Sequence, residues 1–246
     1  MDGAEMSNEL RFFGYEIDAA MRDRLAANLE QILAGGPADR LAKLAAQDLV
    51  ALVDIALRAY YEQPADMISL SPLIRKAADT GMSAVSKAVD MVIHRVLAKR
   101  SLEDLQQMAR DMSSMLCSSQ DEPPRHYVCF PLPAHLYERS QLLIARVHTD
   151  SDVDGYRADI IGSLEDLIEE AIQVYYVAPI SKVEVGRITR VAADMGMTTV
   201  KKGSSMVLHK VFKTMPHATL MPLAEYFQTL LHQGLLPHVL PATARR

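Results

Sequence analysis

The chain has 246 residues, of which 49% are hydrophobic and 23% are charged, and its formal net charge is −5. A chain this apolar, with only 11 Gly and 12 Pro, can bury a core and does not have the composition of an extended disordered protein. No run approaches the roughly 18 to 20 apolar residues of a membrane helix, and the acidic start lacks the basic and apolar order of a secretory signal. With only 2 Cys, the chain is expected to be cytoplasmic and to have no membrane contact.

Helices are expected through most of the first half. They should cover residues 18–34, 37–63, 71–81, 83–99 and 101–116. Asp18 can cap the first helix, and Pro64 should end the second because proline cannot donate a backbone hydrogen bond. Gly81 is placed to end the third helix in a left-handed conformation. Ser101 and Asp104 have the spacing of a capping box at the start of the fifth.

The second half has the same expected plan. Its helices should begin at Pro133 and then cover residues 152–176, 185–195, 198–215 and 218–232. Aromatic, partly alternating runs at 12–17 and 127–132 precede the two sets of helices, and such runs favour extended arms. The remaining segments are a disordered N-terminus at 1–9, a linker at 117–124 and a C-terminal tail at 232–246.

The two halves align with each other without a gap. Residues 10–116 match residues 125–231 at a constant offset of 115 positions. The Tyr-Tyr-x-x-Pro run at 60–64 recurs at 175–179, and the Arg-x-Ala-Ala-Asp-x-Gly-Met run at 75–82 recurs at 190–197. A repeat of this length indicates a duplicated domain, since solenoid units repeat about every 20 to 50 residues. The predicted fold is therefore all-α: a tandem duplication of a five-helix unit of about 107 residues, each with a short aromatic arm, arranged as a pseudo-twofold pair.

Two expected helices concentrate positive charge. Residues 83–100 and 198–215 carry net charges of +3 and +4, so the rest of the chain carries −12. In each helix the valines share one side, while Lys87 with His94, and Lys202 with His209, point to the opposite side. Segregated positive charge is typical of a protein that binds an anionic partner. A solvated helix face beside acidic neighbours of the same chain explains the charge as well. The candidate anion-binding or nucleic-acid-binding residues are Lys87, His94, Arg95, Lys99, Lys201, Lys202, His209, Lys210 and Lys213.

The order of residues before each basic helix resembles that of a helix-turn-helix. A small residue comes first, then a glycine, and then a residue with a hydroxyl group. The turns would lie at Gly81 and Gly196. However, Lys87 and Lys202 stand six positions after the glycines, where such a motif has an apolar residue. An ordinary corner between helices is therefore the alternative interpretation.

Other recurring residues are expected to support the fold. Arg75 with Asp79, and Arg190 with Asp194, have the spacing of an i to i+4 ion pair that orients the following glycine. The tyrosine pairs should make aromatic contacts, with one ring of each pair in the core, and ligand stacking is the alternative for Tyr60, Tyr61, Tyr175 and Tyr176. Met91, which recurs as Met206, is expected to fill the core.

Signatures of an enzyme are mostly absent from the sequence. It has no glycine-rich phosphate loop, no nucleophile elbow and no histidine spacing of a metal site, so no cofactor and no metal are expected. Asp90 and His94 have the spacing of an acid–base pair, but Ser205 replaces the aspartate in the second half. No catalytic residue is therefore assigned.

Three hypotheses of function remain. The first is a non-catalytic interaction or regulatory protein that acts as an intramolecular pseudo-dimer, with a protein as its main partner and with homo-oligomers as a further option. The second is a DNA-binding regulator that uses the helices at 83–100 and 198–215. The third is an anionic small-ligand binder or an enzyme at the interface of the two halves.

Overall fold

The structure is a computed structural model that describes residues 10–68, 71–98, 100–182 and 186–238, without the side chains of Ile188, Thr189 and Ala192. Three parts named in the sequence analysis lie outside these residues: the expected disordered segment at 1–9, Lys99, and the end of the expected tail.

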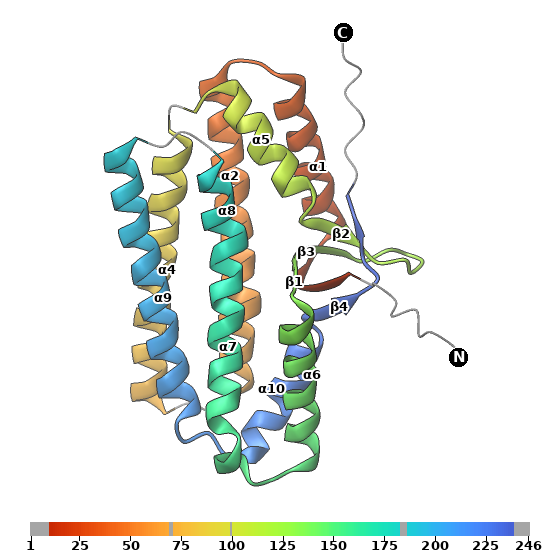
Figure 1. Ribbon diagram of the computed structural model, residues 1–246, viewed down its shortest axis with the longest axis vertical. Coiled ribbons are helices and arrows are strands. Elements are labelled where there is room, and N and C mark those ends of the chain that lie inside the picture. Colours follow the sequence, from red (N-terminus) through yellow and green to blue (C-terminus); the bar gives the residue numbers. More distant parts are fainter. Residues whose placement is uncertain (1–9, 69–70, 99, 183–185, 239–246) are drawn as a thin grey trace, which may run out of the picture.

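The described chain is mostly helical, but it is not all-α (Figure 1). Its helices are α1 (Ala19–Ala34), α2 (Ala38–Leu57), α3 (Gln63–Met67), α4 (Pro72–Leu97), α5 (Leu102–Ser113), α6 (Ala134–Thr149), α7 (Arg157–Ile172), α8 (Ala178–Ser181), α9 (Arg187–Phe212) and α10 (His217–Gln228). Two π-helices, η1 (Arg58–Glu62) and η3 (Gln173–Val177), and the 3₁₀-helix η2 (Val153–Gly155) complete the helical part. The strands are β1 (Arg11–Ile17), β2 (Leu116–Ser118), β3 (His126–Pro131), β4 (Leu231–Gln233) and β5 (Leu236–Pro237).

The five strands form one antiparallel sheet in the order β4-β1-β3-β2-β5. The two aromatic arms pair with each other as β1 and β3, and this pairing corrects the expectation of an all-α fold. Gly14 lies opposite Cys129, which is the residue 115 positions further along the chain. Each arm also pairs with the end of the other half, because β2 runs beside β3 and β4 runs beside β1.

The expected linker and tail were therefore partly wrong. Cys117 and Ser118 belong to β2, and residues 232, 233, 236 and 237 belong to β4 and β5. The reason is that the two arms, once paired, still present unpaired backbone groups at their outer edges, and an adjacent extended segment can satisfy them. A short isolated stretch of sequence carries no signal of such long-range pairing.

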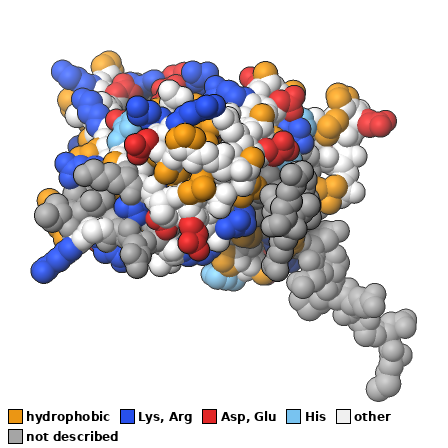
Figure 2. All heavy atoms as spheres, turned by 90° about the horizontal axis from the view of Figure 1, so that it is seen from above, with side chains coloured by type: hydrophobic (Ala, Val, Ile, Leu, Met, Phe, Trp, Pro, Cys, Tyr) orange, Lys and Arg blue, Asp and Glu red, His pale blue; other side chains and the backbone are white. Residues whose placement is uncertain are grey.

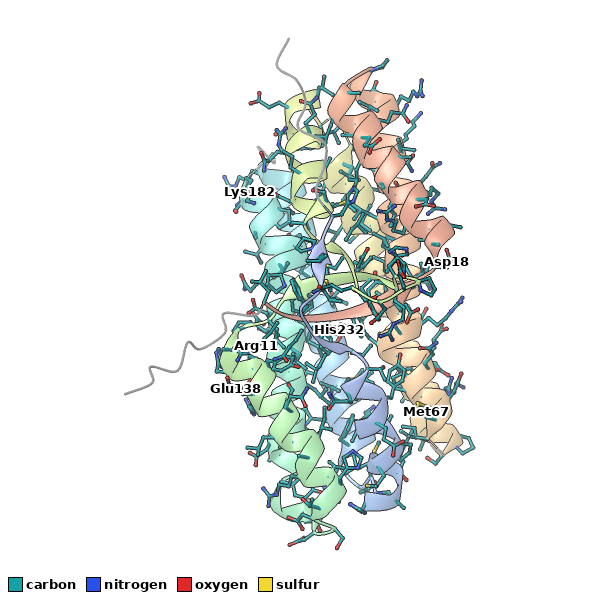
Figure 3. The ribbon with its side chains drawn as sticks, turned by 90° about the vertical axis from the view of Figure 1, so that its right-hand side faces the viewer. Arg11, Asp18, Met67, Glu138, Lys182 and His232 are labelled. Atoms are coloured by element: carbon teal, nitrogen blue, oxygen red, sulfur yellow. The ribbon has the colours of Figure 1, made fainter. Side chains whose placement is uncertain are left out.

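The helices lie in layers beside the sheet. In Figure 1, α4 and α9 are farthest from the sheet, and α2 and α7 lie between them and the remaining elements. Helices α1 and α5 lie toward one end of the molecule, and α6 and α10 lie toward the other. Arg11 of β1 and Glu138 of α6, both labelled in Figure 3, form an ion pair of 3.3 Å that joins the first strand to the second half.

The sheet is buried on both faces. Phe13, Tyr15 and Ile17 point into the main core, as Val128 and Phe130 do on the neighbouring strand. The alternate positions form a second, small apolar cluster on the other face, as expected for side chains that alternate along a strand. That cluster consists of Phe12, Cys117, Tyr127, Cys129 and Leu235. Cys117 and Cys129 are both free thiols.

The second helix does not end before Pro64. It continues through η1 into α3, because the π-turn accommodates the missing N–H of the proline: Gln63 donates to the carbonyl of Arg58 instead of Ala59. The carbonyl of Ala59 accepts a hydrogen bond of 2.6 Å from the hydroxyl of Tyr226, which belongs to α10. The η3 segment before Pro179 is built in the same way, with Ala178 donating to Gln173.

Gly81 and Gly196 do not end helices, and the expected turns there were wrong. Each glycine lies inside a continuous helix of 26 residues, α4 or α9. A Cβ atom added to Gly81 would lie 3.0 Å from a methyl of Val207, and one added to Gly196 would lie 2.8 Å from a methyl of Val92. The glycines therefore permit the close approach of two helices, which a sequence pattern does not distinguish from a left-handed cap.

The central strand pair gives the first prediction. A Cβ atom on Gly14 would lie 2.3 Å from Cβ of Cys129 and 2.4 Å from a backbone oxygen. We expect Gly14→Ala to lower the free energy of unfolding, measured with urea, by roughly 3 kcal/mol, because the strands would have to separate. The control is Gly186→Ala, whose added Cβ would meet no atom within 4 Å. An equal loss in the two variants would contradict this account.

A partly buried histidine gives the second prediction. His232 packs on the ring of Tyr127 at 4.4 Å, and its Nε2 has no hydrogen-bond partner. Burial lowers the pKa of His232 below its ordinary value of 6.5, and Arg125 adds to this effect while the backbone at Gly14 opposes it. Below pH 6.5 the unfolded chain therefore binds more protons than the folded chain, and stability falls as the pH falls.

The measurement is urea unfolding at a series of pH values from 7.5 to 5. His232→Asn should weaken the loss of stability at low pH, and the exposed His135→Asn should leave it unchanged. An unaltered pH dependence in His232→Asn would contradict the assignment.

Candidate functional site

Helices α4 and α9 pack against each other as an antiparallel pair. Gly81 faces Val207, Val85 faces Gly203 and Val92 faces Gly196. Of the valines expected on one side of the basic helices, all are buried except Val211, which is partly buried. The alanines Ala78, Ala88 and Ala193 are buried with them. The remaining side of the pair faces solvent and forms the candidate site.

The solvent side of this pair is named here the α4–α9 face. It contains Thr80, Ala84, Lys87, Met91 and Arg95 on α4, and Met195, Thr199, Lys202, Met206 and Lys210 on α9, all of them exposed. Met91 and Met206 are 37% and 44% exposed, so the expectation that Met91 fills the core was wrong. Each of them extends along the helix crossing, where its methyl group lies 3.6 Å from the Cβ position of the opposing Gly196 or Gly81.

Lys87 and Lys202 lie within about one residue of the same level on the two antiparallel helices. Val85 contacts Gly203, Lys87 lies two residues after Val85 on α4, and Lys202 lies one residue before Gly203 on α9. Within the described residues, neither lysine forms an ion pair. Two unpaired ammonium groups therefore lie between the exposed methionines, near the middle of the face.

Some of the predicted cationic residues have acidic partners. His94 contacts Asp90 at 3.4 Å, His209 contacts Glu165 at 3.3 Å, and Lys201 is paired with Glu169. The two glutamates come from α7, and Glu165 also accepts a hydrogen bond from Ser205. These glutamates were not predicted from the sequence, where only their helical spacing of four residues indicates a shared face.

Five other predicted cations are described, and all are exposed. Arg95, Lys210 and Lys213, like Lys87 and Lys202, form no ion pair with the described residues. The interpretation as a solvated face beside acidic neighbours therefore applies to His94, Lys201 and His209 and not to these five residues. Figure 2, which looks down the long axis, shows one end of the molecule, where Lys and Arg side chains gather with a few Asp and Glu side chains between them.

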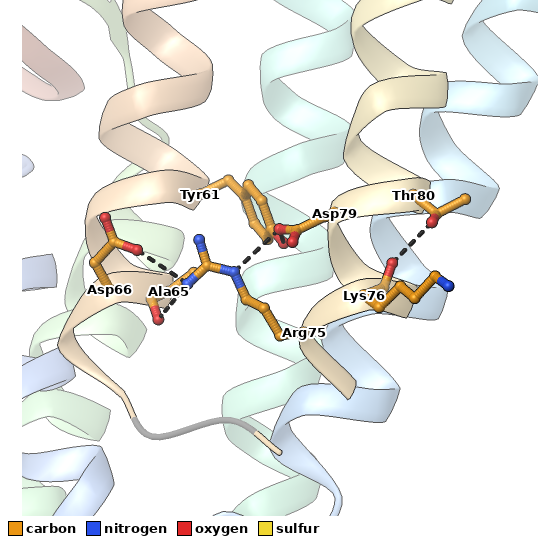
Figure 4. Close-up of polar contacts among 7 residues, drawn as sticks. All are labelled: Tyr61, Ala65, Asp66, Arg75, Lys76, Asp79 and Thr80. Atoms are coloured by element: carbon orange, nitrogen blue, oxygen red, sulfur yellow. Dashed lines mark hydrogen bonds and ion pairs between the residues drawn. The ribbon is translucent and has the colours of Figure 1, made fainter. Parts of the chain in front are cut away.

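Arg75 joins α4 to α3 through a polar cluster (Figure 4). Its guanidinium donates to Asp79 at 3.1 Å, to Asp66 at 2.9 Å and to the carbonyl of Ala65 at 3.2 Å. The hydroxyl of Tyr61 donates to Asp79 at 2.7 Å, and burial together with this hydrogen bond raises the pKa of the tyrosine. The cluster holds the segment after η1 against α4.

The second half keeps the tyrosine–aspartate bond of this cluster. Tyr176 donates to Asp194 at 2.8 Å, and burial followed by this bond raises its pKa. Among the described contacts, Arg190 makes no ion pair with Asp194, so the expected i to i+4 pair is present only in the first half. The tyrosine was expected to make ring contacts, and its hydroxyl turns out to be the recurring group.

The other tyrosine of each pair contacts the sheet. Tyr60 stacks on Phe13 and meets Tyr15 edge-on, each at 5.4 Å, and Tyr175 meets Phe130 edge-on at 5.4 Å. Tyr60 is partly buried, and burial raises its pKa well above the ordinary range. Tyr175 is 39% exposed, so the buried ring of the second pair is Tyr176. Tyr60 and Tyr175 join the π-helices to the paired arms, as expected for aromatic contacts.

Within the described residues, no three His, Cys, Asp or Glu side chains are placed to hold a metal ion, and no helix is long and apolar enough to cross a membrane. Neither a protein-family model, nor a curated protein, nor a solved structure matches the chain. The α4–α9 face is therefore assessed from its own geometry alone.

The recurring hydroxyl gives the third prediction. Tyr61→Phe and Tyr176→Phe should each lower the free energy of unfolding by about 1 kcal/mol, because each removes a hydrogen bond to a carboxylate and leaves the ring in place. Urea unfolding measures the loss, and Tyr137→Phe, which removes a single hydrogen bond from Gln141, serves as the control. If neither substitution has a larger effect than the control, the clusters do not stabilise the fold.

Proposed function

We propose that this protein is a non-catalytic interaction protein, built by tandem duplication as an intramolecular pseudo-dimer. Three contacts between equivalent positions support a twofold relation. Gly14 pairs with its equivalent Cys129, and the contact of Gly81 with Val207 has its counterpart in the contact of Gly196 with Val92. An axis through these places would pass between β1 and β3 and emerge between α4 and α9.

The observation that carries the proposal is the α4–α9 face itself. Unpaired Lys87 and Lys202 lie between exposed Met91 and Met206 on one continuous surface of two packed helices. Exposed methionines provide adaptable apolar contact surface of the kind that binding sites use. A face of this kind suits a protein partner with both apolar and acidic side chains.

Charge disfavours a second copy of this chain as the occupant. Two such faces brought together around a twofold axis would place four lysines near one another, and like charges across an interface are unfavourable. Carboxylates of a different protein would instead pair with Lys87 and Lys202. We therefore propose an acidic, amphipathic helix or helix pair as the partner.

The nucleic-acid alternative has weaker support. Two recognition helices of a dimeric DNA reader lie about 34 Å apart, whereas α4 and α9 are in direct contact. The described residues also contain no turn at Gly81 or Gly196 that would separate a recognition helix from its support. Only the unpaired cations remain in favour of contacts with phosphates.

The fourth prediction concerns peptides that bind the α4–α9 face. A library of random helical peptides is displayed, and the peptides that bind the protein are selected. The selected peptides should be enriched in Asp, Glu and large apolar residues. Combined Lys87→Glu and Lys202→Glu should weaken their binding at least about tenfold, because two ion pairs become repulsions. The control is Lys43→Glu, an exposed lysine on α2.

Equal binding by the charge-reversed variant and the control would contradict the proposal. Duplex DNA in a salt series supplies the alternative outcome. If affinity for DNA falls log-linearly with salt and the charge reversal reduces that slope, the face binds phosphates and not an acidic protein.

A further inference from the structure

A partly open apolar cavity lies mainly in the second half. Its volume is about 70 Å³, and it lies between α6, α7 and α10, with Phe13 of β1, Phe212 of α9 and Leu231 of β4 also in its wall. The lining is apolar except for two side chains, Ser140 of α6 and Ser163 of α7. Both serines are buried, at 7% and 3% exposure.

The corresponding place in the first half is filled. At the offset of 115 positions, Ser140 corresponds to Leu25, which is 1% exposed and belongs to the main core. Ser163 corresponds to Asp48, whose carboxylate accepts a hydrogen bond of 2.8 Å from Asn28 and lies 3.5 Å from Arg24. The first half therefore combines an apolar filler with a satisfied polar group.

The second half has neither the filler nor the polar partner. Ser140 is smaller than the leucine that fills the equivalent place, and Leu143 stands where the first half has Asn28. The two serine hydroxyls are left with one contact, 3.4 Å between their oxygens, which is longer than an ordinary hydrogen bond between hydroxyls. Each hydroxyl therefore retains capacity to donate or accept.

Water is a poor occupant of this space. A buried water makes about three hydrogen bonds, and among the described residues of the cavity wall only the two serines have polar side chains. An empty apolar cavity is destabilising in proportion to its volume, because the lining loses dispersion contacts. A molecule that restores those contacts and also bonds the serines would fit better than either water or a void.

We propose that this cavity is a binding site for a small apolar molecule that carries one hydrogen-bonding oxygen or nitrogen. The aliphatic part contacts Ile144, Leu164 and Leu223, and the polar atom lies at the Ser140–Ser163 pair. Such a division, an apolar wall with few polar groups that fix orientation, is typical of small-molecule sites. The proposal is independent of the proposed protein partner.

The experiment uses the full chain with two probes, isobutanol and xenon, and follows methyl NMR signals of the cavity lining. Both probes should give saturable shifts in the natural protein. Ser140→Leu should weaken both at least about tenfold, because the leucine occupies the space that Leu25 fills in the first half. Ser163→Ala should weaken isobutanol about threefold or more and leave xenon unchanged, since it removes a hydroxyl and not the cavity.

Two controls keep the test independent of folding. The unfolding midpoint of Ser140→Leu should be equal to or higher than that of the natural protein. Ser83→Ala removes an exposed hydroxyl of α4 that forms no hydrogen bond with the described residues and does not line the cavity. The proposal is overturned if neither probe saturates, if Ser140→Leu binds both probes as tightly as the natural protein, or if Ser163→Ala weakens both probes equally.

Discussion

The pairing of β1 with β3 is the constraint on which the rest of the structure depends. The two strands approach so closely at Gly14 and Cys129 that no side chain fits at the glycine. From this centre the sheet extends outward, and each arm takes as its second neighbour the end of the opposite half. The halves therefore complete one sheet and cannot separate as independent domains without breaking it.

The same pairing positions the helices that carry the proposed function. Tyr60 and Tyr175 connect the strands to the π-helices, and the tyrosine–aspartate bonds connect the neighbouring chain to α4 and α9. The two basic helices are thereby placed in contact, with glycines at the crossing. The proposed partner face is therefore one surface made by both helices.

The halves differ where the apolar cavity lies. The first half buries Leu25 and the bonded Asn28–Asp48 pair, whereas the second half has Ser140, Leu143 and Ser163 at the equivalent positions. A change from leucine to serine removes apolar volume without changing the backbone of a helix. The proposed ligand site therefore belongs to one half, while the proposed partner face uses both.

Local sequence signals determined that most of the chain is helical, the capping at Asp18 and Ser101, the burial of most valines of α4 and α9, and the positive charge of these two helices. These features depend on neighbours within a few residues, which the sequence shows directly. Only the tertiary structure decided that the arms form a sheet, that Gly81 lies inside a helix and that Pro64 follows a π-turn. Each of these depends on an atom from a distant part of the chain, such as the methyl of Val207 or the hydroxyl of Tyr226, and spacing along the sequence does not encode that proximity.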